Sequence, residues 1–461
     1  MKNVFIGGCF FLLFVGCINS SDNKYHHHIR SYSDIINSDT LNILTLYSST
    51  SYFIYKGQEM GYEFELARSF AHSMGLFPNI IVASNIHQLT EKLLNGEGDV
   101  VAYPIPRELN HSKMPIKYCG DENITSQVLV QRASKNITSI KDVTQLIDKT
   151  ITVEKGTKYH RRLENLNKEL GGGIIIDAVK QDSLTSEDLI YKVASGEIDY
   201  TLADENVAKV NKTYYKNLNI SLKVSFSQRS SWIVNAVSDS LSNEIDKWFA
   251  NEIKQPEYSV ISKRYFEKSK AATTIGKVYL KNGKISQYDD IFKKCASSIN
   301  WDWRLVAAIA YEESQFDPSA ISWAGARGLM QLMPNTAENY GLSASDFNDP
   351  LLNVETCMKL LDSLQKKFSG IDDETEKMNF VLGSFHAGVG HIVDAIALAK
   401  KFGYNPNKWE RNVATCLTLK SNPQYYNDSI VKLGYFPGYT TIEHVDAILK
   451  RYDMFKNAVK E

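Results

Sequence analysis

The chain has 461 residues, more than one hydrophobic core usually organises, so we expect two or more folded units. Its 52 basic and 53 acidic residues leave a net charge of -1, which gives no electrostatic reason to expect nucleic acid as a partner. With 43% hydrophobic and 23% charged residues, the composition is that of ordinary globular domains.

The N-terminus is typical of a secretory signal. A short charged start precedes the apolar run Val4–Val15, which is too short for a transmembrane helix. Gly16 and Cys17 resemble a bacterial lipobox, so we expect residues 1–16 to be a lipoprotein signal peptide and Cys17 to carry the lipid, with a plain cleaved signal as the alternative. Several acyl chains on one residue anchor stably. Because the next residue is not an aspartate, we expect the outer membrane, facing the periplasm.

Residues 17–40 are expected to be a tether, and residues 41–266 alternate between strand and helix patterns. The predicted strands are Ile43–Leu46, Ile80–Val82, Asp99–Ala102, Thr150–Val153, Ile174–Ile176 and Asp199–Asp204. The predicted helices are Phe64–Met74, His87–Leu94 and Asp188–Ser195. This alternation favours open α/β sheets.

Three short motifs punctuate this region: Gly61–Leu66 (GYEFEL), Gly98–Ala102 (GDVVA) and Gly196–Tyr200 (GEIDY). They resemble solute-binding protein family three, the two-lobed periplasmic amino-acid binders. The resemblance implies that Arg107 grips a ligand carboxylate, for which a guanidinium fork is well suited, and that Asp204 meets the ligand amino group. A surface charge and a helix N-cap are the alternative roles. The run Tyr103–Pro106 before Arg107 departs from the family, which favours a peptide-like ligand, such as a muropeptide, over a free amino acid.

Residues 267–289 form a polar connector ahead of the last predicted unit, residues 290–461. The cysteines beyond the signal lack any CxxC grouping, so one disulfide and free buried thiols both stay open. These cysteines are Cys119, Cys295, Cys357 and Cys416.

The segment from Ala308 to Pro334 carries the strongest chemical signal. Apolar residues over Leu305–Ala310 recur at helical spacing, which predicts a buried helix that Asn300 caps, with Glu313 near its C-terminal end. A carboxyl group on such a helix is partly desolvated, so we expect a raised pKa that keeps it protonated as a general acid. We interpret the neighbouring Glu312 as a surface residue.

Four motifs follow one another in this unit: Glu313-Ser314, Ser322–Pro334 (SWAGARGLMQLMP), Ser384–His391 (SFHAGVGH) and Thr441–Val445 (TIEHV). They resemble the goose-lysozyme-like lytic transglycosylases, which cut peptidoglycan. The sequence departs from the family in three places, listed here with the usual residue: Phe385 for Tyr, His386 for Asn and His444 for Tyr.

The resemblance implies a mainly α, lysozyme-like domain with Glu313 as the catalytic residue. It also implies glycan contacts from Ser322, Gly328, Met330, Gln331, Phe385, His386, Ala387 and His444. For Gly328 a tight turn and for Met330 core packing are alternative roles. No HExxH spacing supports a metal, and we expect neither a metal nor a cofactor.

A site with one convincing carboxylate needs help from its substrate, since ordinary glycosidases use two. The family chemistry that the resemblance implies is protonation of the bond between MurNAc and GlcNAc, followed by attack of the MurNAc C6 hydroxyl and closure of a 1,6-anhydro ring. The alternatives are a muramidase that hydrolyses the same bond and a non-catalytic glycan-binding sensor or scaffold.

Overall fold

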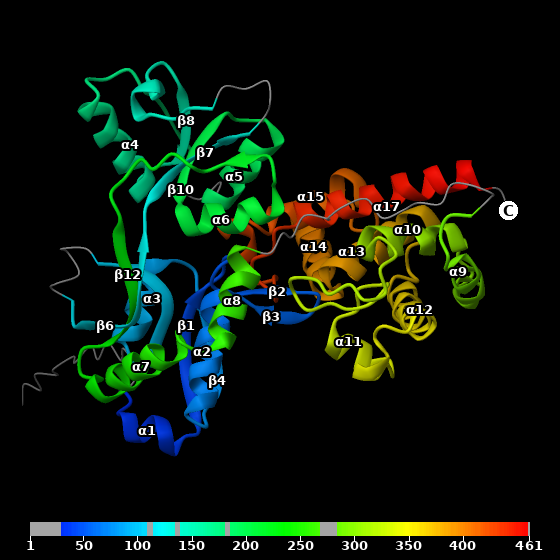
Figure 1. Ribbon diagram of the computed structural model, residues 1–461, viewed down its shortest axis with the longest axis horizontal. Coiled ribbons are helices and arrows are strands. Elements are labelled where there is room, and N and C mark those ends of the chain that lie inside the picture. Colours follow the sequence, from blue (N-terminus) through cyan, green and yellow to red (C-terminus); the bar gives the residue numbers. More distant parts are fainter. Residues whose placement is uncertain (1–28, 108–113, 134–138, 180–184, 268–283, 460–461) are drawn as a thin grey trace, which may run out of the picture.

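The computed structural model describes residues 29–107, 114–133, 139–179, 185–267 and 284–459. Cys17 and the predicted signal lie outside these ranges. Figure 1 shows a two-lobed α/β unit on the left and a helical unit on the right. This arrangement confirms the predicted fold class. Within the described ranges, none of the helices has the length and apolar character needed to cross a membrane.

Lobe 1 is built on a five-stranded sheet with the order β4-β1-β5-β12-β6. β1 pairs in parallel with β4 and β5, whereas β12 is antiparallel to both of its neighbours. The strands are β1 (Thr40–Leu46), β4 (Phe77–Ala83), β5 (Val100–Pro106), β6 (Ile116–Thr125) and β12 (Gln228–Asn235). The helices are α1 (Tyr32–Asn37), α2 (Tyr62–Ser73), α3 (Ile86–Leu94), α7 (Asp239–Glu252) and α8 (Pro256–Phe266). Ile35 of α1 belongs to the core of this lobe, within the range predicted as tether.

Lobe 2 is built on a second sheet with the order β11-β7-β10-β8-β9. Its strands are β7 (Gln127–Arg132), β8 (Thr150–Glu154), β9 (Ile175–Val179), β10 (Tyr200–Asp204) and β11 (Leu218–Asn219). Its helices are α4 (Lys158–Glu169), α5 (Ser186–Ser195) and α6 (Glu205–Tyr214). The chain passes between the lobes twice, from β6 to β7 and from β11 to β12. The sequence analysis predicted the parallel strands and missed the antiparallel β6, β7, β11 and β12.

The helical unit packs its core around α10 (Trp303–Ser314), which contacts α9 (Asp289–Ala296) and α17 (Tyr439–Ala458). Its other helices are α11 (Pro334–Asn339), α12 (Pro350–Lys367), α13 (Glu374–Ala387), α14 (Val389–Phe402), α15 (Ala414–Leu419) and α16 (Pro423–Tyr426). The apolar residues that predicted α10 are fully buried, which confirms that prediction.

The predicted cap of this helix was wrong. Asp302, not Asn300, is the N-cap, and its carboxylate accepts a hydrogen bond from the backbone N–H of Arg304 at 2.9 Å. Asn300 instead closes the preceding turn in a left-handed conformation with φ 56°. Asn tolerates that conformation better than most residues, which explains its position.

A β-hairpin leaves lobe 1 and reaches the helical unit (Figure 1). It consists of β2 (Phe53–Tyr55) and β3 (Gln58–Met60), which pair antiparallel around a two-residue turn. Lys56 and Gly57 at the tip both have positive φ, as such tight hairpin turns require. The sequence analysis did not predict this hairpin.

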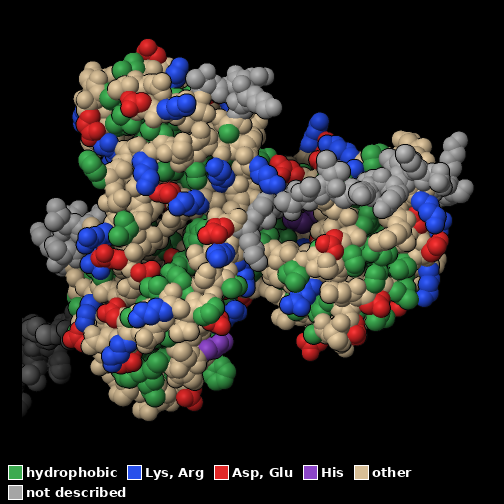
Figure 2. All heavy atoms as spheres, in the orientation of Figure 1, with side chains coloured by type: hydrophobic (Ala, Val, Ile, Leu, Met, Phe, Trp, Pro, Cys, Tyr) green, Lys and Arg blue, Asp and Glu red, His purple; other side chains and the backbone are tan. Residues whose placement is uncertain are grey.

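Figure 2 shows charged side chains of both signs interspersed over the visible face, in keeping with the near-zero net charge. The four cysteines whose state the sequence left open are free and buried.

Gly328 provides a test of this packing. It has φ +80°, and a Cβ there would lie 2.3 Å from both Asn353 Nδ2 and the carbonyl oxygen of Phe347. We expect Gly328→Ala to lower the free energy of unfolding by roughly 2 to 4 kcal/mol, because backbone strain and a clash add together. Gly325, with φ +91° and open space around it, is the matched control. Equal losses for Gly328→Ala and Gly325→Ala in thermal or urea unfolding would contradict the close packing.

Candidate active site

Glu313 sits in the last turn of α10, where its side chain is only 7% exposed. The helix ends because Gln315 takes a left-handed conformation with φ 55°. Ser314 donates a hydrogen bond from Oγ to the carbonyl oxygen of Leu329 at 2.7 Å. The end of the helix is thereby joined to the turn formed by the Ser322–Pro334 motif.

That turn is held together mainly by its own polar groups. Gln331 donates from Nε2 to the carbonyl oxygens of Ala320 at 2.9 Å and Gly328 at 2.8 Å. Ser322 Oγ accepts from the backbone N–H of Ala326 at 2.9 Å. Met330 is fully buried in the core of the helical unit. In this structure, Gly328, Met330 and the Gln331 amide nitrogen shape the turn.

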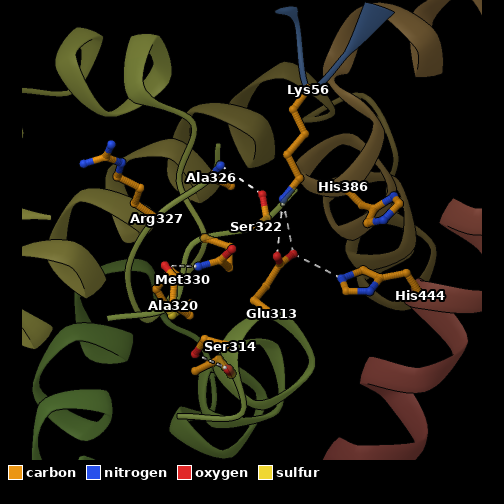
Figure 3. A network of polar contacts seen from close by, with 12 residues as sticks. Lys56, Glu313, Ser314, Ala320, Ser322, Ala326, Arg327, Met330, His386 and His444 are labelled. Atoms are coloured by element: carbon orange, nitrogen blue, oxygen red, sulfur yellow. Dashed lines mark hydrogen bonds and ion pairs between the residues drawn. The ribbon is translucent and has the colours of Figure 1, made fainter. Parts of the chain in front are cut away.

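Two histidines from different helices lie beside the carboxylate (Figure 3). His444 of α17 places Nε2 3.2 Å from Glu313 Oε1. His386 of α13 lies with its ring centroid 4.4 Å from that of His444, and its Nδ1 is 2.9 Å from Thr441 Oγ1. Burial lowers the pKa of His386 well below its ordinary value, so this ring is neutral. The structure thus brings together three residues that the sequence analysis singled out.

The third neighbour of Glu313 comes from the hairpin and was missed by the sequence analysis. Lys56 Nζ lies 3.4 Å from Oε1 and 3.3 Å from Oε2 of Glu313, and both side chains are less than a tenth exposed. The same ammonium lies 5.0 Å from the ring centroid of Phe385. The sequence did carry a signal for the turn, which is a lysine followed by a glycine between two short aromatic and polar runs. No local pattern indicated that this lysine pairs with Glu313.

The ion pair reverses the expected pKa of Glu313. Burial alone raises the pKa, as the sequence analysis argued. The positive charge of Lys56 and the contact with His444 outweigh burial, so the pKa of Glu313 is lowered. The expectation of a raised pKa is therefore wrong for this arrangement, in which Glu313 is ionised.

A second contact holds the hairpin on the helical unit. His391 of α14 has Nε2 3.0 Å from the carbonyl oxygen of Ile54, and its Nδ1 lies 2.8 Å from Lys420 Nζ. Because an ammonium can only donate, Nδ1 accepts and the ring proton is on Nε2, which donates to the hairpin. Lys420 is completely buried and also pairs with Asp394 at 2.7 Å. Burial lowers the pKa of Lys420 to about 8, so at neutral pH its ammonium is still the charged partner of Asp394.

The hairpin tip covers a cavity of about 350 Å³ in the helical unit. The wall includes Gln331 and Phe385, both predicted as glycan contacts, and the tip residues Lys56, Gly57 and Gln58. In this arrangement the hairpin therefore occupies one side of the candidate glycan groove.

The two lobes enclose another cavity, of about 470 Å³, which we call the interlobe cleft. Asp204 lines it and pairs with Lys158 of α4. Arg107 is not among the lining residues, and its guanidinium lies 3.3 Å from Glu122. The structure therefore brings Asp204 into the cleft and leaves Arg107 outside it.

A buried carboxylate connects both lobes to the helical unit. Glu187 of α5 accepts from Ser49 Oγ at 2.8 Å and from Tyr435 Oη at 2.5 Å. Ser49 lies between β1 and the hairpin, and Tyr435 belongs to the helical unit. Glu187 therefore links lobe 2 both to the base of the hairpin and to the helical unit.

Within the described part of the chain, no group of three or more His, Cys, Asp or Glu side chains is placed to hold a metal ion.

The fold and the motifs place the protein among the lysozyme-like lytic transglycosylases that carry a solute-binding domain.

Comparison with known proteins agrees with this class. Residues 290–408 match the family model of the transglycosylase SLT domain. Membrane-bound lytic murein transglycosylase F of Desulfosudis oleivorans is 30% identical over 443 residues, which cover 94% of this chain and 93% of that protein. The protein of the same name from Shewanella sediminis is 30% identical, with 96% and 90% covered. Among solved structures, a mutant of ArgBP from T. maritima is similar at 20% identity and a TM-score of 0.42, covering 51% of this chain and 99% of that one.

The chain therefore belongs to the membrane-bound lytic murein transglycosylase F family, and it is a peptidoglycan lytic transglycosylase.

Proposed function

We propose that the protein cleaves the β-1,4 bond between MurNAc and GlcNAc and leaves 1,6-anhydroMurNAc ends. Glu313 protonates the bridging oxygen while the MurNAc acetamido oxygen supports the charge that develops at C1. Glu313 then takes the proton of the C6 hydroxyl, which attacks C1 and closes the ring. An internal hydroxyl held near C1 has a high effective molarity, so the protein has to orient the sugar and exclude water.

The setting of Glu313 is the observation that carries this proposal. The polar contacts recorded for its side chain are Lys56 and His444, and neither supplies a second carboxylate. The neighbouring Glu312 turns away and pairs with Arg451 at 3.0 Å. Burial acts to raise the pKa of Glu313, in the direction that a general acid requires, and in the docked state Lys56 and His444 oppose it.

We assign the supporting roles as follows. His444 orients the Glu313 carboxylate, and Phe385, Gln331, Ser322 and His386 contact the glycan. Ala387, also predicted as a glycan contact, is fully buried in the core of the helical unit. Because α17 packs on α10 and carries His444, the transglycosylase domain extends over residues 290–461, beyond the 408 limit of the family match. Residues 41–266 form the solute-binding domain and residues 267–289 the linker.

Glu313→Gln keeps the side-chain shape and removes the proton donor, so we expect glycan release to fall by a factor of about 1,000 or more. Mass spectrometry of digested peptidoglycan measures both the release and the chemistry of the new ends. Glu312→Gln is the control and should retain activity within about threefold. Reducing ends would establish a muramidase, and undiminished release by Glu313→Gln would reject its assigned role.

We also propose that a lipid on Cys17 anchors the protein to the outer membrane, with its domains in the periplasm. Membrane association is part of the name that its relatives carry. Cys17→Ala should be exported but recovered in the soluble periplasmic fraction, because the anchor is lost. If this variant still sediments with outer membranes to the same extent, the lipid assignment is wrong.

Finally, we propose that the hairpin is a removable plug and that a peptide or amino-acid ligand of the interlobe cleft controls it. In the docked state Lys56 keeps Glu313 ionised, and the tip takes up one side of the groove. An ionised carboxyl group cannot act as the acid in the first step. The docked state described here is therefore a resting state.

The route from the cleft to the plug is short. Thr50 lines the cleft, and the hairpin begins at Phe53. Ser49, the residue before Thr50, is bonded to Glu187 of lobe 2. A ligand that prefers the closed lobes would shift this joint, and a difference in affinity between the two states is what coupling requires. Asp204 is positioned in the cleft to meet an amino group, and cell-wall peptides are the natural candidates near this substrate.

Lys56→Met tests the plug. It removes the charge that holds Glu313 ionised and leaves a buried carboxylate unpaired in the docked state, so docking becomes unfavourable. We expect the rate of cleavage without added peptide to rise about tenfold.

The control is Lys117→Met, which removes a partly exposed lysine of the same lobe that pairs with Asp239. Added muropeptides should accelerate the wild type and have little effect on Lys56→Met. In the variant Asp204→Ala, basal cleavage should be normal and the response to peptide lost. If peptides that bind the wild type leave its rate unchanged, the N-terminal domain serves docking or localisation instead.

A further inference from the structure

A third cavity lies beside α8 and adjoins the interlobe cleft. We call it the α8 cavity. Its volume is about 500 Å³, within the range of small-ligand sites. It is enclosed by α2, β6 and β12 of lobe 1, by α6 of lobe 2 and by α8, the last helix before the connector. The residues used below are Tyr62, Glu63, Asp121, Ser231, Trp232 and Tyr258.

Glu63 is the buried acid of this cavity. It is 7% exposed, and its carboxylate accepts one hydrogen bond, from Trp232 Nε1 at 2.7 Å. Burial raises its pKa to about 7, and the negative charge of Asp121 acts in the same direction. Asp121 lies at the mouth, where Tyr258 donates to it at 3.3 Å. Neither carboxyl group has an ion-pair partner among the described residues.

Of the remaining charges of the wall, those of Glu122 and Lys209 are matched to other groups, and Glu267 is exposed. Glu122 faces the guanidinium groups of Arg107 at 3.3 Å and Arg229 at 3.6 Å. Lys209, which also lines the cavity, pairs with Glu205 at 2.8 Å. The wall therefore offers negative charge that the described side chains leave uncompensated.

The rest of the wall suits an amine on an apolar stem. Ser231 is 1% exposed, and its Oγ has no hydrogen-bond partner in the described structure. Buried hydroxyl groups are usually hydrogen-bonded, so this one is available to a ligand. Trp232 packs edge-on against Phe249 with ring centroids 5.0 Å apart, and Tyr62 donates to Tyr258 at 2.9 Å. Aromatic faces beside a carboxylate favour ammonium groups through cation–π attraction.

We propose that the α8 cavity binds a primary ammonium group on an amino acid or peptide, with Glu63 as its buried anionic partner and Asp121 at the mouth. Tyr62, Trp232 and Tyr258 form the apolar wall around the stem of the ligand. Ser231 Oγ accepts a further hydrogen bond from the same end of the ligand.

The α8 cavity adjoins the interlobe cleft, and Glu63 lines both. Asn206 of lobe 2 donates to Asn123 of lobe 1 at 2.9 Å, and both residues border the two cavities, so their pair forms part of the partition. Asp121 borders the α8 cavity alone, and Asp204 borders the cleft alone. The inference does not depend on whether the cleft controls catalysis.

Titration calorimetry of the full-length protein tests the proposal with two probes that differ only at the side-chain nitrogen. Nα-acetyl-lysine amide carries one ammonium, and Nα,Nε-diacetyl-lysine amide carries none. We expect the first to bind and the second to bind at least about tenfold more weakly, since hydrogen bonds to charged groups contribute more than neutral ones. Glu63→Gln should lower the affinity for the amine by about tenfold while keeping an acceptor for Trp232, and Asp121→Asn by a smaller factor.

Two controls locate the effect. Glu257→Gln removes an exposed carboxylate of α8 that does not line the cavity and should leave binding unchanged. Asp204→Asn alters only the cleft and should also leave it unchanged. Asp121→Asn changes an exposed residue, so it remains informative if Glu63→Gln fails to fold. Equal binding of the two probes, a loss confined to Asp204→Asn, or binding of N-acetylglucosamine in place of the amine would overturn the proposal.

Discussion

The ion pair between Lys56 and Glu313 is the interaction on which the arrangement of the two units depends. Both side chains are less than a tenth exposed, and taking two charges out of water is costly unless each remains close to the other. Burial lowers the pKa of Lys56, but its neighbours, Glu313 first among them, outweigh burial, so the pKa is raised above its ordinary value. Both partners of the pair therefore favour their charged forms. The pair is stable only while the hairpin is docked.

In the structure the hairpin is docked, and Glu313 is ionised and paired. The proposed resting state follows from this constraint, because the proposed first step needs the protonated form of Glu313. The other contacts of the hairpin join aromatic rings and neutral groups, and Phe53 and Met60 are buried in a cluster shared with the helical unit. Tyr55 lies 5.5 Å from the ring of Trp323, and His391 donates to a hairpin carbonyl.

The sequence predicted the parts of the fold that depend on local patterns. The buried helix that ends near Glu313, the parallel strands of both lobes and the break before the helical unit follow from hydrophobic period and composition. The antiparallel β6 and β12 were missed because their pairing joins segments more than a hundred residues apart, from Ile116 to Asn235. The N-cap was misplaced by two residues, because Asn300 and Asp302 are both acceptable caps and only the backbone distinguishes them.

The sequence was enough to predict Glu313 as the candidate acid, but not the direction in which its pKa is shifted. The motif around Glu313 indicated an acid on a buried helix, and burial does raise its pKa. Lys56 lies in another unit, 257 positions earlier in the chain, so no local pattern could reveal the charge that reverses the shift. Arg107 illustrates the same limit, since its place after a strand was consistent with a ligand contact, whereas in the structure it pairs with Glu122.

The most direct test of the resting state is the pKa of Glu313 in the unliganded wild-type protein. Carbon-13 NMR titration of the side-chain carboxyl can measure it, with Glu313→Gln identifying the signal. A pKa below the ordinary 4.5 of a glutamate is the predicted result, because Lys56 and His444 stabilise the ionised form. A pKa at or above 4.5 would show that the hairpin does not hold Glu313 charged and would contradict the account.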